Sequence, residues 1–288
     1  MLSGQHLDPA LSWARDKYIG AELYGNNKEL ILKELRRILF ADVEKLIRET
    51  GQEMPFQPEL LAAKRKVKSI SEVELSKANA LLIPEVGGFI IKIRYDVHPF
   101  QKRFACAHEI GHTYFFNIDH DPPRREYQHD KSAYWVEEDF SCAIARDILL
   151  PSFSIRQTVI GKLPPSISAL RYLSRSYQAS FDIIRKRIIN DIPIWDCIVF
   201  RSTMSGEEIA TKGFDISKGS SYQRVTIPNT IVKESAYGEM LPVFHAAQDE
   251  GFAKKMVNFC GKQYLLETMR INDERSEFLS VLTFGPKN

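Results

Sequence analysis

Two histidines and a glutamate form the pattern with the clearest chemical meaning in this sequence. His108 and His112 lie four positions apart, and Glu109 directly follows the first of them. On an α-helix, residues four apart share a face, so both imidazoles can bind one Zn²⁺ ion at about 2.0–2.1 Å each. Glu109 is then placed to act as general base toward a water molecule whose pKa the metal lowers. The pattern predicts a zinc-dependent peptidase.

A catalytic zinc needs a third protein ligand as well as an open coordination position. The acidic run Glu137-Glu138-Asp139 opens the next helical segment and offers three carboxylates. Helical spacing alone does not decide which of the three points toward the histidines. Four side chains in the nearby loops are further candidates, although an ordinary surface position is the simpler interpretation for each: His98, Asp119, His120 and His129.

Three consecutive segments must bring these side chains together. Pro99 suits the first turn of a helix, which we expect to run from about 99 to 116. The polar segment 117–131 contains two adjacent prolines and predicts a loop. A second helix is expected from about 134 to 150, since Pro151 cannot continue it.

The segments before this region predict a helix pattern followed by a hairpin. Residues 10–50 have helical spacing, with apolar side chains at three- and four-residue steps: Ile31, Leu35, Ile38, Leu39, Val43, Leu46 and Ile47. The basic run 64–68 is interpreted as a solvated strand or turn. Residues 80–84 and 87–95 predict two strands joined by a turn near Pro84 to Gly88.

The composition changes after Pro193, where stretches rich in β-branched and aromatic residues begin. Three of them resemble strands: 195–200, 222–227 and 278–284. The predicted organisation is a helical region at 1–62, a catalytic domain with a trailing helical pair at 63–190, and a C-terminal α+β or mainly β domain at 191–288. His245 in the last domain is interpreted as a structural or surface residue.

Composition places the chain among ordinary globular proteins. The net charge of +2 gives no bias toward nucleic acid or an anionic membrane. No run of about 18 apolar residues occurs, and the first nine residues lack the apolar core of a signal peptide, so we expect a cytoplasmic protein with no membrane partner. The cysteines are far apart, which argues against a disulfide framework or a zinc ribbon: Cys106, Cys142, Cys197 and Cys260.

The segment Gln101 to His112 resembles the Arg-Phe-x-x-Ala-His-Glu-Leu-Gly-His segment of the ImmA/IrrE metallopeptidases. Residues 138–151 resemble the second helix of that family, in which a Glu is followed by small residues and a Phe-Ala pair before a closing Leu-Leu-Met-Pro. Counting back from the closing proline places the family's zinc-binding Glu on Glu138. The resemblance covers roughly residues 85–155 and implies a mainly helical zincin-like core with a small β-sheet.

The sequence departs from the family pattern at two positions of the second helix. The family usually has Asn or Asp four residues after its Glu ligand, where this chain has Cys142. This thiol can pack as a small side chain, approach the metal, or mark a redox-sensitive site, and packing is the simplest interpretation. Ile144 stands where Phe is expected, which is a milder change.

The resemblance also implies a biological role. Members of the family typically cut a helix-turn-helix repressor and so activate mobile-element or stress-response genes, and some carry a sensor-like C-terminal domain. The strand at 88–95 is expected to be the edge on which an extended substrate docks. The alternative is a metal-binding regulatory or interaction protein with little peptidase activity.

Direct DNA binding by the helical pair at 166–189 is a further possibility that the sequence raises. Five basic residues fall in this segment: Arg171, Arg175, Arg185, Lys186 and Arg187. They lack a recognition-helix pattern, and we interpret them as a solvated helix face.

Overall fold

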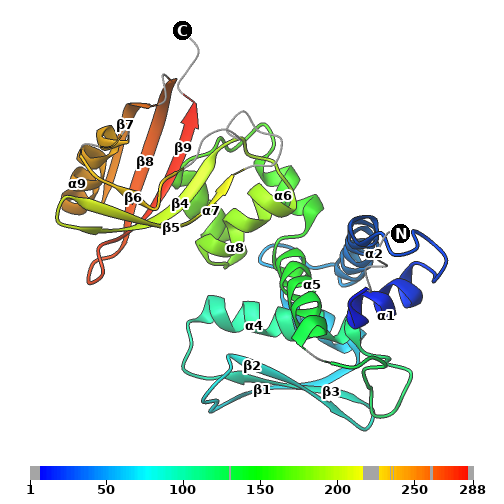
Figure 1. Cartoon of the computed structure of the whole chain (residues 1–288). Helices are drawn as coiled ribbons and strands as arrows, with labels where there is room; N and C mark the ends of the chain where they lie inside the picture. Colours follow the sequence, from blue (N-terminus) through cyan, green and yellow to red (C-terminus); the bar gives the residue numbers. More distant parts are fainter. Residues whose placement is uncertain are drawn as a thin grey trace. The chain divides into compact units, whose positions relative to one another are not determined.

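The computed structural model describes residues 7–129, 131–216, 227–233, 235, 237–259 and 262–284. The protein is mixed α+β and divides into two compact units (Figure 1). The first unit comprises residues 1–152 with 176–180, and the second comprises 153–175 with 181–288. Among the described residues, no helix has both the length and the apolar composition of a membrane span.

The first unit begins with three helices, α1 (Pro9–Tyr18), α2 (Lys28–Glu49) and α3 (Pro58–Ala62). The Asp8 carboxylate accepts hydrogen bonds from the N–H groups at the start of α1, and the Asn27 side chain does the same for α2. The helical pattern expected at 10–50 is therefore two helices with a break between them. The predicted apolar stripe is confirmed at four-residue steps, and its fully buried members are Ile31, Leu35, Leu39, Val43 and Ile47.

A three-stranded sheet follows, formed by β1 (Val67–Val73), β2 (Ala80–Glu85) and β3 (Gly88–Arg94). The predicted hairpin is confirmed, because β2 and β3 are antiparallel and their last pair is Glu85 with Gly88. The expectation that the strand at 88–95 is an edge is wrong. The strand order is β1-β3-β2, with β1 parallel to β3, so β3 is central and β2 is an edge.

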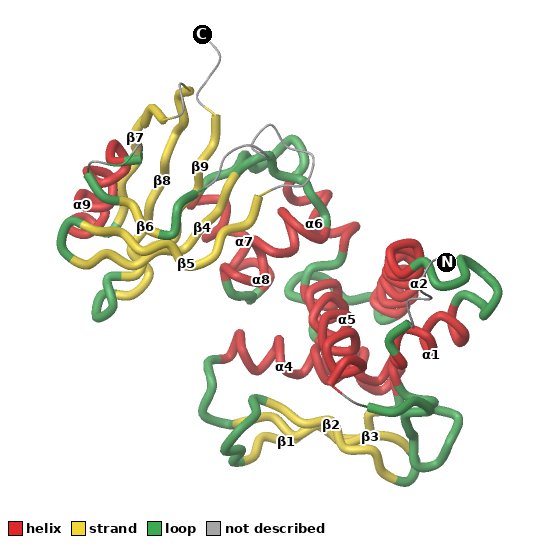
Figure 2. The backbone as a smooth tube through the Cα atoms, in the orientation of Figure 1, coloured by secondary structure: helices red, strands yellow, loops and turns green. Residues whose placement is uncertain are grey.

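Two long helices complete the first unit, α4 (Pro99–His112) and α5 (Lys131–Leu149). Pro99 occupies the first turn of α4, as predicted, and a short 3₁₀ turn (Thr113–Phe115) extends this helix close to its predicted end. Helix α4 contacts β2, β3 and α5, and Figure 2 shows it between the sheet and α5.

A glycine allows the close contact between α4 and α5. A Cβ atom on Gly111 would lie only 2.8 Å from the carbonyl oxygen of Ser141 and 2.9 Å from its Cα. Any larger residue would therefore push the two helices apart, which is the packing reason for a glycine inside a helix, where it costs about 1 kcal/mol relative to Ala.

The second unit is built around a six-stranded antiparallel sheet in the order β6-β5-β4-β9-β8-β7. Its strands are β4 (Ile198–Ser205), β5 (Glu208–Ile216), β6 (Thr230–Ile231), β7 (Phe252–Phe259), β8 (Lys262–Asn272) and β9 (Glu277–Phe284). One face packs against α9 (Leu241–Glu250) through a core that includes Phe200, Phe244 and Phe278. His245 is exposed on α9, in agreement with its interpretation as a surface residue.

The helices of this unit are α6 (Ser152–Val159), α7 (Ile167–Tyr177), α8 (Phe181–Arg185) and a π-helical turn (Lys186–Asp191). The backbone N–H of Ile167 donates to the buried Glu267 carboxylate of β8 at 2.9 Å, and Trp195 Nε1 donates to the carbonyl of Leu163. These contacts attach most of the helical segment to the sheet. The division of the chain therefore differs from the boundary predicted near residue 190.

Three further sequence expectations meet the structure here. The expected strands at 195–200 and 278–284 correspond to β4 and β9, whereas all but Ile227 of the segment 222–227 lies outside the described residues, as does Cys260. The interpretation of the basic segment as a solvated face is wrong for Arg187, whose side chain is fully buried and lies 3.8 Å from Asp191.

Candidate metal centre

Helices α4 and α5 bring three metal-binding side chains to one place. The Nε2 atoms of His108 and His112 are 3.0 Å apart. Glu138 of α5 faces both of them, with Oε2 at 3.2 Å from the Nε2 of His108 and Oε1 at 3.4 Å from that of His112. The two rings meet nearly edge to face, at an interplanar angle of 87°. The two imidazoles and the carboxylate therefore converge on a single point.

The separations between these donor atoms fit a Zn²⁺ ion. Two ligands at about 2.0–2.1 Å on a tetrahedral ion lie roughly 3.3–3.4 Å from each other. The three observed separations span 3.0–3.4 Å. Two imidazoles with one carboxylate form a donor set that suits zinc and leaves a fourth position for water or substrate. The residues present thus fit the metal that the sequence pattern predicts.

Cys142 offers an alternative donor to the same site, and the geometry argues against it. His108, Glu138 and Cys142 present donor atoms that all lie within 4.8 Å of one another. The thiol, however, is 3.5 Å from Nδ1 of His108, which is the ring nitrogen opposite the Nε2 that faces Glu138. Since the two nitrogens of one imidazole point in different directions, we favour the set with His112, and Cys142 lies behind the ligand His108.

The Glu137 carboxylate lies behind the other histidine, His112. Its Oε1 is 2.6 Å from Nδ1 of this ring, and the Glu137 side chain is completely buried. Burial raises the pKa of Glu137, but hydrogen bonds from His112 and Arg125 outweigh that effect and lower it to about 2. Glu137 is therefore ionised at neutral pH. Adjacent residues of the acidic run thus have different positions, since Glu138 faces both Nε2 atoms and Glu137 faces the far side of one ring.

Asp139, the third residue of the acidic run, points away from the histidines. Its carboxylate is exposed and forms an ion pair with Arg36 at 2.9 Å. Helical neighbours are about 100° apart around the axis, so three consecutive side chains cannot share one direction.

Glu109 is in the position that a general base requires. Its side chain is buried, with 8% of the residue exposed. Burial raises the pKa of Glu109, while the nearby His112 and His108 and a hydrogen bond with the backbone of Leu82 act in the opposite direction. A carboxylate with a raised pKa is a better proton acceptor at neutral pH than an ordinary one.

The two histidines hold protons strongly when no metal is bound. Burial lowers the pKa of His108, but hydrogen bonds with Cys142 and Glu138 outweigh this and raise it to about 10. The pKa of His112 is raised as well, because its hydrogen bonds with Glu137 and Glu138 also outweigh its burial. Those same bonds to the histidines hold the pKa of Glu138 below its usual value. The cluster is a negatively charged pocket that attracts a cation.

Most of the loop candidates have other partners. His98 caps α4 by accepting a hydrogen bond from the N–H of Phe100, and His120 lies 2.9 Å from Glu126. The N–H of Asp119 donates to the Asn117 side chain. His129 is closer to the centre, with Nε2 at 3.3 Å from Oε2 of Glu137.

Two residues of the same loop were missed by sequence analysis. Arg125 makes two hydrogen bonds to the Glu137 carboxylate, at 2.6 and 3.0 Å, and the Tyr127 hydroxyl donates a third. Nothing in their spacing relates them to the histidine pair, since both belong to a polar loop whose path is set only by tertiary contacts.

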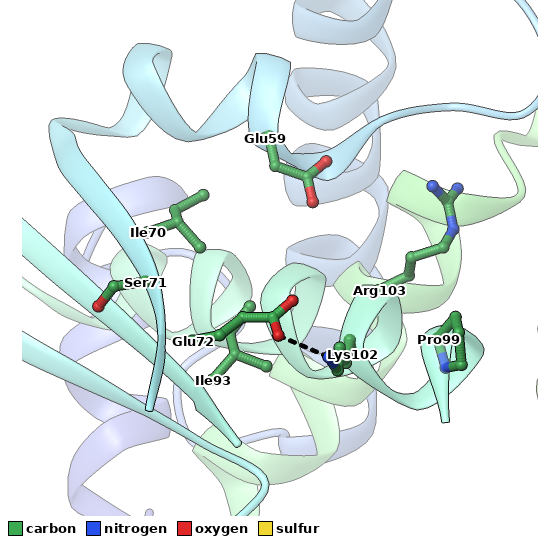
Figure 3. Close-up of a pocket in the computed structure, with 8 residues that line it drawn as sticks. All are labelled: Glu59, Ile70, Ser71, Glu72, Ile93, Pro99, Lys102 and Arg103. Carbon is green, nitrogen blue, oxygen red and sulfur yellow. Dashed lines mark hydrogen bonds and ion pairs between the residues drawn. The ribbon is translucent and has the colours of Figure 1, made fainter. Parts of the chain in front are cut away.

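A pocket of about 380 Å³ lies on the same unit but does not include the metal-centre residues. It is lined by residues of α3, β1, β3 and the first turns of α4 (Figure 3). Lys102 and Glu72 form an ion pair across it at 2.6 Å. Its charged groups are of both signs, and we assign it no ligand.

Comparison with known proteins gives a likeness of fold only. No family model and no curated protein matches the sequence with significance. Among solved structures, the chain is similar to a protein described as a Mycobacterium tuberculosis transcriptional regulator, with a TM-score of 0.52 and 14% sequence identity. That likeness covers 88% of this chain and 94% of the other.

Proposed function

We propose that this protein is a zinc-dependent endopeptidase with His108, His112 and Glu138 as metal ligands and Glu109 as general base. The observation that supports this most strongly is the convergence of two Nε2 atoms and one carboxylate within 3.4 Å of each other. A buried glutamate adjacent in the chain to the first ligand adds the base. A site that only held a structural metal would not require that base.

The chemistry divides between the ion and the side chains. A Zn²⁺ ion at this site acts as a Lewis acid that activates water and polarises the carbonyl of the bond to be cut. Glu109 accepts the proton of the attacking water, and the protonated carboxyl then delivers it to the departing amine. Its raised pKa suits both steps, because the group must gain and lose a proton near neutral pH.

The edge strand β2 is the part of the fold best suited to hold an extended substrate. It pairs with β3 on one side only, so its other side has backbone groups available for a further strand. A hydrogen bond links the backbone of Leu82 in this strand to Glu109, which puts the edge next to the general base. This assignment replaces the central strand β3, which the sequence had favoured. The resemblance to ImmA/IrrE enzymes suggests a helix-turn-helix repressor as the substrate.

Three proteins test the proposal: the wild type, Glu109→Gln and Glu138→Ala. Each is analysed for bound zinc and incubated with purified helix-turn-helix repressors from the same genome. We expect about one zinc per chain in the wild type and in Glu109→Gln, cleavage by the wild type alone, and loss of zinc in Glu138→Ala. Cleavage by Glu109→Gln at the wild-type rate would refute the mechanism.

A regulatory protein with little peptidase activity is the second candidate. It is favoured by the likeness in fold to a protein described as a transcriptional regulator, which extends over most of this chain. It predicts that the wild type binds zinc but cuts no repressor, and that zinc instead changes binding to a repressor or to DNA. The same three proteins therefore separate the two candidates.

A further inference from the structure

We propose that Glu137 is a positioning residue for the metal ligand His112 and that the loop 117–129 controls metal affinity through Arg125 and Tyr127. The inference rests on the proposed metal centre. It concerns residues that touch neither the metal nor a substrate, and it gives the loop a role in building the centre.

The contacts of Glu137 determine how His112 can bind a metal. An ionised carboxylate only accepts hydrogen bonds, so the 2.6 Å contact requires a hydrogen on Nδ1 of His112. In the neutral ring, Nε2 then carries the free lone pair, and it faces Nε2 of His108 and Glu138. Glu137 thus selects the tautomer that binds a metal and fixes the direction of the ring.

The loop supplies what keeps this buried carboxylate in place. An unpaired buried charge is unfavourable, but Arg125 forms a two-point ion pair with both oxygens of Glu137. The Tyr127 hydroxyl donates to Oε2, and His129 lies 3.3 Å from the same oxygen. Both oxygens are therefore held from the loop side, and their orientation toward His112 depends on the loop.

The two ligand histidines differ in this support. Nδ1 of His108 is 3.5 Å from the Cys142 sulfur, which is a weak hydrogen-bond partner. His112 has an ionised carboxylate at 2.6 Å instead. The carboxylate that the related enzymes place in the second helix, four residues after the Glu ligand, is absent here, and the residue before the ligand provides one for the other histidine. His112 is therefore the better-positioned ligand.

The test measures zinc affinity by competition with a chromogenic chelator, in proteins first stripped of metal. Glu137→Gln removes the charge, and Tyr127→Phe removes one hydroxyl from the loop. We expect about a 10–100-fold loss of affinity in Glu137→Gln and a smaller loss in Tyr127→Phe. Asp139→Asn is the matched control for the first change, because Asp139 is an exposed acid on the same helix. Tyr172→Phe, at an exposed tyrosine of α7, is the control for the second.

Two additional measurements separate positioning from simple loss of folding. Thermal unfolding of the metal-free proteins shows whether each variant is folded, and ¹⁵N NMR of the imidazoles reports the tautomer of His112. If Glu137→Gln is unfolded, Tyr127→Phe still provides the test, because its change is one atom.

The outcomes distinguish this inference from the proposed function. If the wild type binds no zinc, the proposed function fails and the inference fails with it. If the wild type binds zinc and both folded variants bind it equally well, the metal centre stands and the positioning role is wrong. Reduced affinity in both variants, with unchanged affinity in both controls, supports the role.

Discussion

The Cys142 sulfur lies 3.5 Å from Nδ1 of His108, on the side of the ring that faces away from Glu138. This places a thiol where related enzymes have an Asn or Asp that can orient the histidine. It also explains how the chain can keep both histidine ligands while departing from the family pattern, since the second carboxylate comes from Glu137.

Replacing this thiol by a carboxylate should strengthen metal binding. In Cys142→Asp, the new side chain can accept a hydrogen bond from Nδ1 of His108, much as Glu137 does for His112. We expect zinc affinity to increase by up to about 10-fold, since such partners are generally worth 10–100-fold. Chelator competition measures the change, and Cys142→Ala serves as the control. An affinity no higher than that of the Ala variant would contradict the prediction.

Zinc affinity should rise with pH. The pKa of His108 is raised to about 10 in the metal-free protein, so at pH 7 this ring holds a proton that the metal must displace. Each displaced proton gives about a tenfold increase in affinity per pH unit until the pH reaches the pKa. Chelator competition from pH 6 to pH 8, corrected for the chelator's own protonation, tests this. Affinity independent of pH would show that neither histidine is protonated there.

Stability in acid should depend on Glu137. Its pKa is lowered from 4.5 in an unfolded chain to about 2 in the folded protein. A lowered carboxyl pKa contributes stability that is present above pH 4.5 and is lost as the pH falls through 2. Glu137→Gln should therefore be less stable than the wild type at pH 6, by about 1.5–3 kcal/mol. The difference should shrink between pH 4.5 and pH 2 in urea unfolding of metal-free protein, and a constant difference would be inconsistent with this assignment.

Gly111→Ala should destabilise the first unit. The added Cβ would lie 2.8 Å from the Ser141 carbonyl oxygen, a backbone atom that cannot move without shifting α5. Overpacking of this kind costs about 1–3 kcal/mol, which exceeds the gain of about 1 kcal/mol in helix propensity at the upper end of that range. Urea unfolding measures the result, and Ala41→Gly at an exposed position of α2 calibrates the helix-propensity term. An Ala variant more stable than the wild type would mean that the helices separate easily.

Glu109→Gln should retain zinc and lose peptidase activity. The amide has the shape of the carboxylate but cannot accept the proton of water, and general bases contribute about 10²–10⁴-fold to rate. Because burial raises the pKa of Glu109, wild-type activity should also decline on the acid side at a pH above the 4.5 of an ordinary glutamate. A pH–rate profile on a cleaved repressor measures this limb, and zinc content confirms that the variant remains loaded.

Local sequence determined much of the scaffold. The pairing of His108 with His112 on one helical face follows from their four-residue spacing, and the prolines and glycines fixed the start of α4 and the hairpin of β2 and β3. These features depend only on residues close together in the chain, where helix geometry and backbone preferences act directly.

Only the tertiary structure decided the features that depend on distant segments. Spacing could not choose between Glu137 and Glu138, because both contact His112 and the choice depends on how α5 lies against α4. The central position of β3 results from parallel pairing with β1, which precedes the hairpin and has an irregular pattern of burial. The roles of Arg125 and Tyr127 depend on a loop that folds back onto a buried carboxylate, and no local periodicity encodes such a contact.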